Sequence, residues 1–172
     1  MCHLAQGGCI NKVLIFGNSG SGKSTLAKHI SALKSLSHLD LDTLAWQNTQ
    51  PVQRMPLSES ATQIEAFIQD HNEWVIEGCY TDLLELAVQH CTEIIFLNLP
   101  VAACINNAKN RPWEPHKYPS KQAQDQNLEM LLEWITQYDT RSDTFSKAAH
   151  QTFYDNYHGK KSVHHRNHIL AV

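Results

Sequence analysis

The chain has 172 residues, a length that suits one domain, with 14 basic and 17 acidic residues and a formal net charge of −3. This balance lacks the basic excess of most nucleic-acid-binding proteins, so we expect no direct contact with nucleic acid. Apolar residues make up 42% and charged residues 18% of the chain, which allows a core of ordinary size and argues against disorder. No apolar run is long enough to span a bilayer, and residues 1–6 lack the features of a secretory signal, so we expect no membrane contact.

The cysteine pattern argues against a disulfide framework or a zinc ribbon. The chain has five cysteines, an odd number, and no C-x-x-C pair. Cys79, Cys91 and Cys104 sit among apolar residues, where a free cysteine usually packs as a small hydrophobic side chain. This usage predicts a reducing, cytoplasmic compartment.

Short apolar runs and polar turns predict the elements of the first half of the chain. We expect a strand at 12–16, a helix from 24 to about 33, a strand at 36–40 and a loop at 47–56. Ser60 and Gln63 fit a capping box, and Ile64, Phe67 and Ile68 follow it at helical spacing. The pattern therefore predicts a helix that begins at Ser60.

The second half alternates in the same way. We expect a strand at 74–77, a short helix at 82–89, a strand at 93–97, a helix opened by Pro100, a loop at 111–120, an amphipathic helix around 128–135, a helix at about 143–151 and a strand at 162–165. Strands that alternate with helices indicate βαβ units, and hence a parallel sheet covered on both faces. The sequence offers no linker, so we predict a single domain over 1–172.

The most informative segment follows the first predicted strand and matches the phosphate-loop pattern G-x-x-x-x-G-K-[ST]. Its residues are Gly17, Asn18, Ser19, Gly20, Ser21, Gly22, Lys23, Ser24 and Thr25. Glycines let successive backbone N–H groups point at one anion, and the following helix directs its positive end there. In this pattern Lys23 reaches the β- and γ-phosphates and the Ser24 hydroxyl binds Mg²⁺. We therefore predict ATP and Mg²⁺ as cofactors.

Two classes of P-loop protein are disfavoured by what the chain lacks. The guanine-reading N/T-K-x-D motif of small GTPases is absent, and so is D-x-x-G. Large motor and AAA-type modules need a longer chain and a firm acid after a core strand. Here the corresponding strand is followed by Asn98.

Four stretches resemble the small P-loop kinases related to adenylate kinase and shikimate kinase. They are the loop at 17–25, H-L-D-L-D-T-L-A-W at 38–46, W-V-I-E-G-C-Y at 74–80 and I-I-F-L-N-L-P at 94–100. Among these kinases the chain is most similar to the bacterial family described as topology modulation protein or adenylate-kinase-like ATPase. The resemblance implies a three-layer α/β P-loop fold with a five-stranded parallel sheet in the order 2-3-1-4-5 and a small lid at about 109–123. It also implies transfer of the γ-phosphoryl group of ATP to a small-molecule or nucleotide acceptor.

The acids after the second strand are the candidates for handling the acceptor. Asp42 would orient the nucleophile, and Asp40 would lie beside the acceptor and, with Ser24, in the magnesium shell. Gly78 would let the backbone approach the acceptor, while Tyr80 and Trp46 would line its pocket. Glu77 could face the same cleft.

Positive charge at the transferred group is expected from Arg111 and Arg141, assigned with Lys23 and Asp42 as catalytic residues. Lys109, Lys117 and Lys121 could assist. The region between the second and third strands offers Arg54 alone among arginines, which favours a hydroxylated acceptor over a monophosphate. The cluster of histidines near the C-terminus lacks partners at ligand spacing, so a metal site there is disfavoured. His165 and Arg166 follow the last predicted strand, where a loop could hold adenine.

Three functions remain open. The first is a small-molecule or nucleotide kinase, whose lid would exclude water. The second is a slow ATPase without an acceptor, which the small number of arginines in the lid favours. The third is an ATP-binding regulatory protein related to DNA topology, which the acidic balance disfavours. The sequence predicts no oligomeric state.

Overall fold

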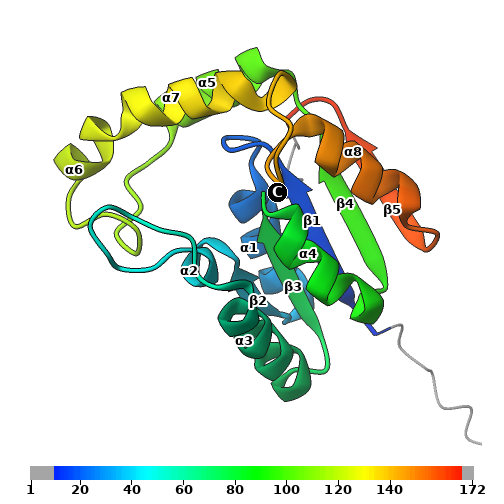
Figure 1. The fold of residues 1–172 in the computed structure, drawn as a ribbon. Coiled ribbons are helices and arrows are strands. Elements are labelled where there is room, and N and C mark those ends of the chain that lie inside the picture. Colours follow the sequence, from blue (N-terminus) through cyan, green and yellow to red (C-terminus); the bar gives the residue numbers. More distant parts are fainter. Residues whose placement is uncertain (1–9, 168–172) are drawn as a thin grey trace, which may run out of the picture.

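The computed structural model describes residues 10–167, which form a five-stranded sheet with helices on both faces (Figure 1). The strands are β1 (Lys12–Gly17), β2 (Ser37–Asp40), β3 (Trp74–Gly78), β4 (Glu93–Leu97) and β5 (Lys160–His164). The helices are α1 (Lys23–Lys34), α2 (Asp42–Ala45), α3 (Leu57–Asp70), α4 (Thr81–Ala87), α5 (Val101–Asn110), α6 (Lys121–Gln126), α7 (Leu128–Thr136) and α8 (Lys147–Asn156). Short 3-10 turns at Val88–His90 and Gln137–Asp139 follow α4 and α7.

The strand order is β2-β3-β1-β4-β5 and every pair is parallel, which confirms the predicted sheet. In register, Phe16 of β1 lies between Gly78 of β3 and Phe96 of β4. The carboxyl ends of these strands therefore meet at one edge, where open α/β sheets bind their ligands. The phosphate loop leaves β1 at this edge, and the strand-2 acids leave β2 there.

The two faces of the sheet support separate cores because side chains alternate along each strand. Leu14, Phe16 and Ile76 pack against α3, α4 and α8 on one face. Val13, Ile15 and Val75 pack against α1, α5 and α7 on the other. Both clusters contain a cysteine, Cys79 and Cys104 respectively, which pack as hydrophobic side chains as predicted.

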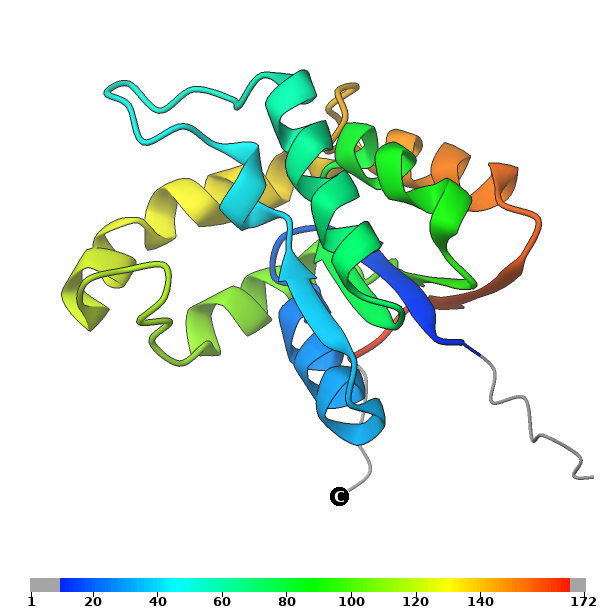
Figure 2. The same ribbon diagram turned by 90° about the horizontal axis from the view of Figure 1, so that it is seen from below.

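Figure 2 shows the two helical layers on opposite sides of the sheet, with α6 far from β5. Residues 111–120 run as irregular chain between α5 and α6. This segment corresponds to the predicted lid and lies beyond the carboxyl edge of the sheet.

Two predicted helix starts are wrong. Helix α3 begins at Leu57 after Pro56, and Ser60 is fully buried within it, with its hydroxyl donating to the Leu44 carbonyl at 2.8 Å. Proline is pre-organised for a helix start, so it determines the boundary in place of the S-x-x-Q pattern. Helix α8 begins after Ser146, whose hydroxyl accepts from the Ala149 N–H, whereas Asp143 caps a preceding turn at the Phe145 N–H.

Candidate active site

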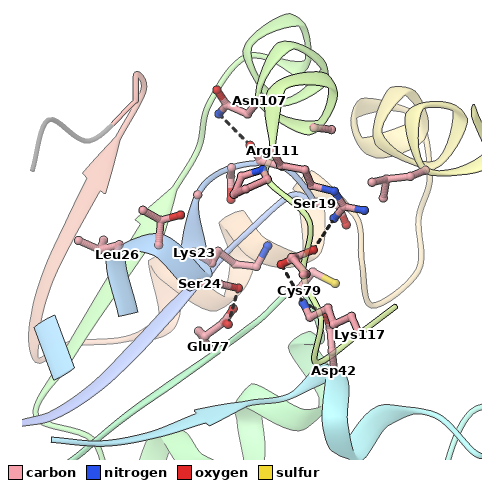
Figure 3. A pocket seen from close by; sticks show the side chains of 18 of the residues that line it. Ser19, Lys23, Ser24, Leu26, Asp42, Glu77, Cys79, Asn107, Arg111 and Lys117 are labelled. Atoms are coloured by element: carbon pink, nitrogen blue, oxygen red, sulfur yellow. Dashed lines mark hydrogen bonds and ion pairs between the residues drawn. The ribbon is translucent and has the colours of Figure 1, made fainter. Parts of the chain in front are cut away.

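The phosphate loop joins β1 to α1 at the carboxyl edge of the sheet, as its position in the sequence predicts (Figure 3). Gly20 and Gly22 adopt positive φ angles of 76° and 90°, which turn the backbone into a concave loop. Residues 19–25 line a cavity of about 500 Å³ that also receives Asp42 from α2 and Arg111 and Lys117 from the lid segment. Gly17 and Asn18 of the predicted phosphate loop do not line the cavity.

Gly20 is required for a second, steric reason, which leads to a prediction. A Cβ atom at Gly20 would lie 2.4 Å from the Cys104 carbonyl oxygen of α5, whereas one at Gly22 would meet nothing within 4 Å. We expect Gly22→Ala to lower the free energy of unfolding by about 1–2 kcal/mol through backbone strain alone, and Gly20→Ala by about 2–5 kcal/mol because the clash adds to the strain. Urea unfolding of both variants measures the difference, and equal losses would contradict this account.

Lys23 is largely buried, and its ammonium donates to the Asn18 carbonyl at 2.8 Å. Asn18 in turn donates from its side chain to the Ile135 carbonyl of α7 at 3.2 Å. The Ser21 hydroxyl is buried without a hydrogen-bond partner among the described residues. A buried cation and an unpaired hydroxyl on a loop of inward-turned backbone fit a bound phosphate chain, which would satisfy both.

Glu77 joins the loop from β3. It is 1% exposed, and its Oε1 accepts from the Ser24 hydroxyl at 2.6 Å (Figure 3). The His38 imidazole of β2 lies 3.6 Å from the same oxygen. The carboxylate therefore orients the hydroxyl predicted to bind Mg²⁺. Glu77 was named from the sequence only as a residue that could face the acceptor cleft, and it lines the cavity. A buried acid inside an otherwise apolar strand is the sequence signal for it.

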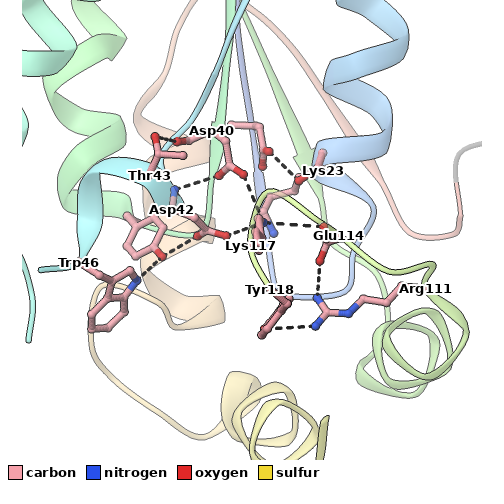
Figure 4. A network of polar contacts seen from close by, with 12 residues as sticks. Lys23, Asp40, Asp42, Thr43, Trp46, Arg111, Glu114, Lys117 and Tyr118 are labelled. Carbon is pink, nitrogen blue, oxygen red and sulfur yellow. Dashed lines mark hydrogen bonds and ion pairs between the residues drawn. The ribbon is translucent and has the colours of Figure 1, made fainter. Parts of the chain in front are cut away.

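The strand-2 acids converge on one lid residue, Lys117 (Figure 4). Its ammonium lies 2.8 Å from an Asp42 oxygen and 3.2 Å from an Asp40 oxygen. Desolvation opposes ionisation of Asp42, but the charge and hydrogen bond of Lys117 and the hydrogen bond from Tyr80 outweigh it and lower the pKa of Asp42. Desolvation and the nearby Glu77 and Asp42 carboxylates raise the pKa of Asp40. The two acids are therefore inequivalent, with Asp42 the more readily ionised.

A buried amide on α6 fastens the lid segment to that helix. Gln124 is 3% exposed, accepts from the Glu114 N–H at 2.8 Å and donates to the Pro112 carbonyl at 3.0 Å. Arg111 lines the cavity, and its guanidinium pairs with Glu114 at 3.0 Å. Lys117 was named only as an assisting cation, together with Lys109 and Lys121, yet of these three it alone lines the cavity.

Arg141 is not brought to this cavity. Its guanidinium pairs with Asp143 at 2.8 Å and lies over the Trp134 ring, with 3.6 Å between the guanidinium carbon and the ring centroid. It lines a separate groove between α4 and α8. A carboxylate two residues away and an aromatic face thus hold the charge that was expected at the transferred phosphoryl group.

Three residues predicted to contact the acceptor, Tyr80, Trp46 and Gly78, also lie outside the cavity lining. Tyr80 is 3% exposed and Trp46 is half-buried, and neither lines the cavity; both pack in an aromatic cluster behind Asp42. At Gly78 a Cβ atom would lie 2.9 Å from the Leu41 side chain, so packing of the α2 start against β3 explains this glycine. Of the residues predicted to bind the acceptor, Asp42 lines the cavity. Asp40 does not line it, but it pairs with Lys117, which does.

His150 of α8 fastens the end of β3. It is fully buried, with Nε2 2.9 Å from the Cys79 carbonyl and Nδ1 2.8 Å from the Tyr138 hydroxyl. Because the carbonyl only accepts, Nε2 carries the proton and Tyr138 donates to Nδ1. Burial lowers the pKa of His150 from its usual 6.5 to about 4.

This shift predicts a loss of stability in acid. Between pH 6.5 and 4 the unfolded chain binds a proton at His150 that the folded protein excludes, so the free energy of unfolding falls as the pH falls. The contribution amounts to about 3 kcal/mol over this range. Urea unfolding of the wild type and of His150→Gln at several pH values isolates this contribution. The free energy of unfolding of the wild type minus that of the variant should fall by about 3 kcal/mol from pH 7 to pH 4. A difference that stays constant would contradict the prediction.

Among residues 10–167 no group of three or more His, Cys, Asp or Glu side chains is arranged to hold a metal ion. A magnesium ion at this site would depend on the Ser24 hydroxyl and on nucleotide oxygens, with Glu77 beside that hydroxyl as an acid that lines the cavity. No helix of the described part has the length and apolar character needed to cross a membrane.

The family model described as ABC transporter matches residues 8–153. The chain belongs to this family. The matched range contains the phosphate loop and strands β1–β4, so the match shows a P-loop nucleotide-binding domain and does not by itself assign transport. No curated protein matches the chain. The similarity to the topology-modulation proteins is tested by none of these comparisons and stays a prediction.

Solved kinases resemble the chain in fold. A shikimate kinase from Bacteroides thetaiotaomicron is 12% identical, with a TM-score of 0.51 over 91% of this chain and 87% of that one. A sugar kinase from Janibacter sp. HTCC2649 is 12% identical over 91% and 85% of the two chains (TM-score 0.49). A shikimate kinase from Acinetobacter baumannii in complex with shikimate is 14% identical over 84% and 90% (TM-score 0.43). At such identities the first match shows the P-loop kinase-like fold alone, and the other two are too distant to support an argument.

Proposed function

We propose that the protein transfers the γ-phosphoryl group of Mg·ATP to a hydroxyl group of a small acceptor. The observation that carries this proposal is that one cavity holds both the phosphate loop, with Lys23, and the ionised Asp42. The cavity of about 500 Å³ is lined by Ser19–Thr25 on one side and by Asp42, Lys117 and Tyr118 on another. A phosphate donor and an activated hydroxyl could thus meet in it.

The chain's own groups supply what phosphoryl transfer needs. The acceptor oxygen forms a bond to the γ-phosphorus, the bond from that phosphorus to the β–γ bridging oxygen breaks, and ADP leaves. Asp42 orients the hydroxyl and takes its proton, while Lys23 and Arg111 face the charge on the moving group. Magnesium, held at Ser24 with Glu77 and Asp40 nearby, would neutralise charge on the phosphates.

The state of the arginines supports an acceptor without a phosphate of its own. Arg54 pairs with Asp82 at 3.0 Å and lies over the Trp46 and Tyr80 rings. Arg141 is held by Asp143, and Arg111 by Glu114. Of these three arginines only Arg111 lines the cavity, and a phosphate on the acceptor would have to compete with Glu114 for it. A hydroxylated acceptor therefore fits the site better than a nucleoside monophosphate.

The same pairing favours the second candidate, a slow ATPase. Arg111 and Lys117, which the lid segment contributes to the cavity, both contact carboxylates, which leaves less positive charge for the transferred group.

ADP release from Mg·ATP distinguishes the two functions. It is measured alone and with matched neutral and phosphorylated acceptors, namely sugars and sugar phosphates, nucleosides and their monophosphates, and shikimate-like acids. A rise with a neutral hydroxyl compound supports the kinase and names its acceptor class. A slow rate that no acceptor changes supports the ATPase, and no turnover with any addition refutes both.

A regulatory role in DNA topology has a different readout. A gel shift with duplex DNA at low salt would detect binding, which the acidic balance of the chain leads us not to expect.

A further inference from the structure

The two oxygens of the Asp42 carboxylate have different partners. Oδ2 accepts from the Lys117 ammonium at 2.8 Å and faces the lid. Oδ1 accepts from the Tyr80 hydroxyl at 2.6 Å, and that hydroxyl accepts from the Trp46 indole N–H at 2.7 Å. Figure 4 shows this chain of contacts running from the indole through the tyrosine to Asp42 and on to Lys117.

Chemistry fixes the direction of every proton in this chain. An indole N–H can only donate, so the Tyr80 oxygen accepts from it, and the single hydroxyl proton of Tyr80 goes to Asp42. Burial and the nearby acidic groups raise the pKa of Tyr80 well above its usual value, which keeps that proton in place. The indole N–H therefore donates to the Tyr80 oxygen, and the Tyr80 hydroxyl donates to Oδ1 of Asp42.

The aromatic cluster holds the tyrosine still. Tyr80 is 3% exposed, and its ring packs edge-on against Phe145, with 5.3 Å between centroids, and against Trp46, with 6.3 Å. The Arg54 guanidinium lies 5.2 Å from the centre of the Tyr80 ring. The hydroxyl therefore sits at a fixed point on a rigid support.

We propose that Tyr80 and Trp46 are positioning residues that hold Oδ1 of Asp42, so that this carboxylate presents only Oδ2 to the acceptor. The inference rests on the proposed function and replaces direct acceptor contact as the role of these two aromatic residues. Asp42 has a 42% exposed side chain at the start of a four-residue helix, so without the tyrosine it could rotate about its Cα–Cβ bond. A fixed carboxylate avoids the cost of ordering it in each turnover.

Removal of the hydroxyl alone tests the idea. Tyr80→Phe keeps the ring and its packing, and we expect kcat to fall about 10- to 100-fold while the KM for ATP stays within twofold. In the Asp42→Asn background the same change should cost much less, because the positioned charge is already gone. Where no acceptor has been identified, ATP hydrolysis, with water as acceptor, provides the rate.

Tyr157→Phe is the matched control. It also removes one hydroxyl, which contacts the Cys91 carbonyl at 3.4 Å outside the cavity, and it should leave kcat unchanged. A folded Tyr80→Phe protein with wild-type kcat, or with an equal loss in both Asp42 backgrounds, would overturn the inference.

A spectroscopic measurement tests the series of hydrogen bonds from Trp46 through Tyr80 to Asp42 independently of turnover. The Trp46 indole N–H resonance, assigned by Trp46→Phe among the four tryptophans, should shift in Tyr80→Phe and also in Asp42→Asn, whose side chain is linked to the indole through the Tyr80 hydroxyl. A resonance that ignores Asp42→Asn would overturn the inference. If the wild type showed no ATP turnover while the Trp46 resonance still responded to both substitutions, the proposed function would be refuted. The hydrogen bonds from Trp46 through Tyr80 to Asp42 would then have no catalytic role.

Discussion

Lys23→Met is expected to lose at least about 100-fold in ATP turnover, because the ammonium is the buried positive charge of the phosphate loop and stabilises the charge that moves in transfer. Its fold should persist, since methionine has a similar length and the sheet contacts do not involve the ammonium. In the folded protein the Lys23 ammonium binds the Asn18 carbonyl, and that carbonyl also accepts from the Ser21 N–H at 3.2 Å, so it keeps a partner in the variant. ADP release and thermal unfolding measure the two effects separately.

Lys28→Met on the same helix is the control for this variant. Lys28 is exposed and does not line the cavity, so its loss should leave turnover unchanged. Wild-type turnover in a folded Lys23→Met protein would refute the assignment of the phosphate loop as the reaction site.

The central strands β1, β3 and β4 could be predicted from sequence because they are buried on both faces and therefore appear as continuous apolar runs. The edge strands β2 and β5 are only half-buried or largely exposed and lack this signal. The predicted strand at 93–97 matches β4 at both ends, and the one at 74–77 falls one residue short of β3. Helix starts were harder to locate, because a serine hydroxyl can cap the start of a helix or be buried inside one, and the sequence pattern is similar in both cases. Ser146 caps α8, whereas Ser60 is buried in α3.

The phosphate loop could be predicted because its chemistry is local: nine consecutive residues contain the turn, the cation and the hydroxyl. The remainder of the candidate site depends on contacts between distant segments. Ser24 meets Glu77 across 53 positions, and Asp42 meets Lys117 across 75. No periodicity or spacing encodes these pairs, and which lid lysine meets the acids depends on how Gln124 folds residues 111–120.

Arg141 was predicted to lie at the transferred phosphoryl group, but it lines a different groove. It was named as a candidate cation because positive charge beside the transferred phosphoryl group lowers the barrier to transfer. Its actual direction is set by two short-range features, the Asp143 carboxylate and the Trp134 ring. A nearby carboxylate and an aromatic ring thus hold a charge that the reaction chemistry alone would place at the phosphates.

Asp42→Asn is expected to lower kcat by about 10²- to 10⁴-fold, the range for loss of a general base, while the affinity for ATP changes by no more than a few-fold. The amide can still accept the Tyr80 proton at Oδ1, but it turns an NH₂ group toward Lys117 and carries no charge to take the acceptor proton. Steady-state kinetics give kcat, and equilibrium titration with a nucleotide analogue gives the affinity.

Asp125→Asn is the control for the loss of a carboxylate, because Asp125 lies on α6 outside the cavity and forms an ion pair with Lys121. It should behave as the wild type in both measurements. If Asp42→Asn instead weakened ATP binding and left kcat intact, the carboxylate would belong to the nucleotide site. Oδ2 would then serve the metal–phosphate group rather than the acceptor, and the chain from Trp46 through Tyr80 would position a nucleotide contact.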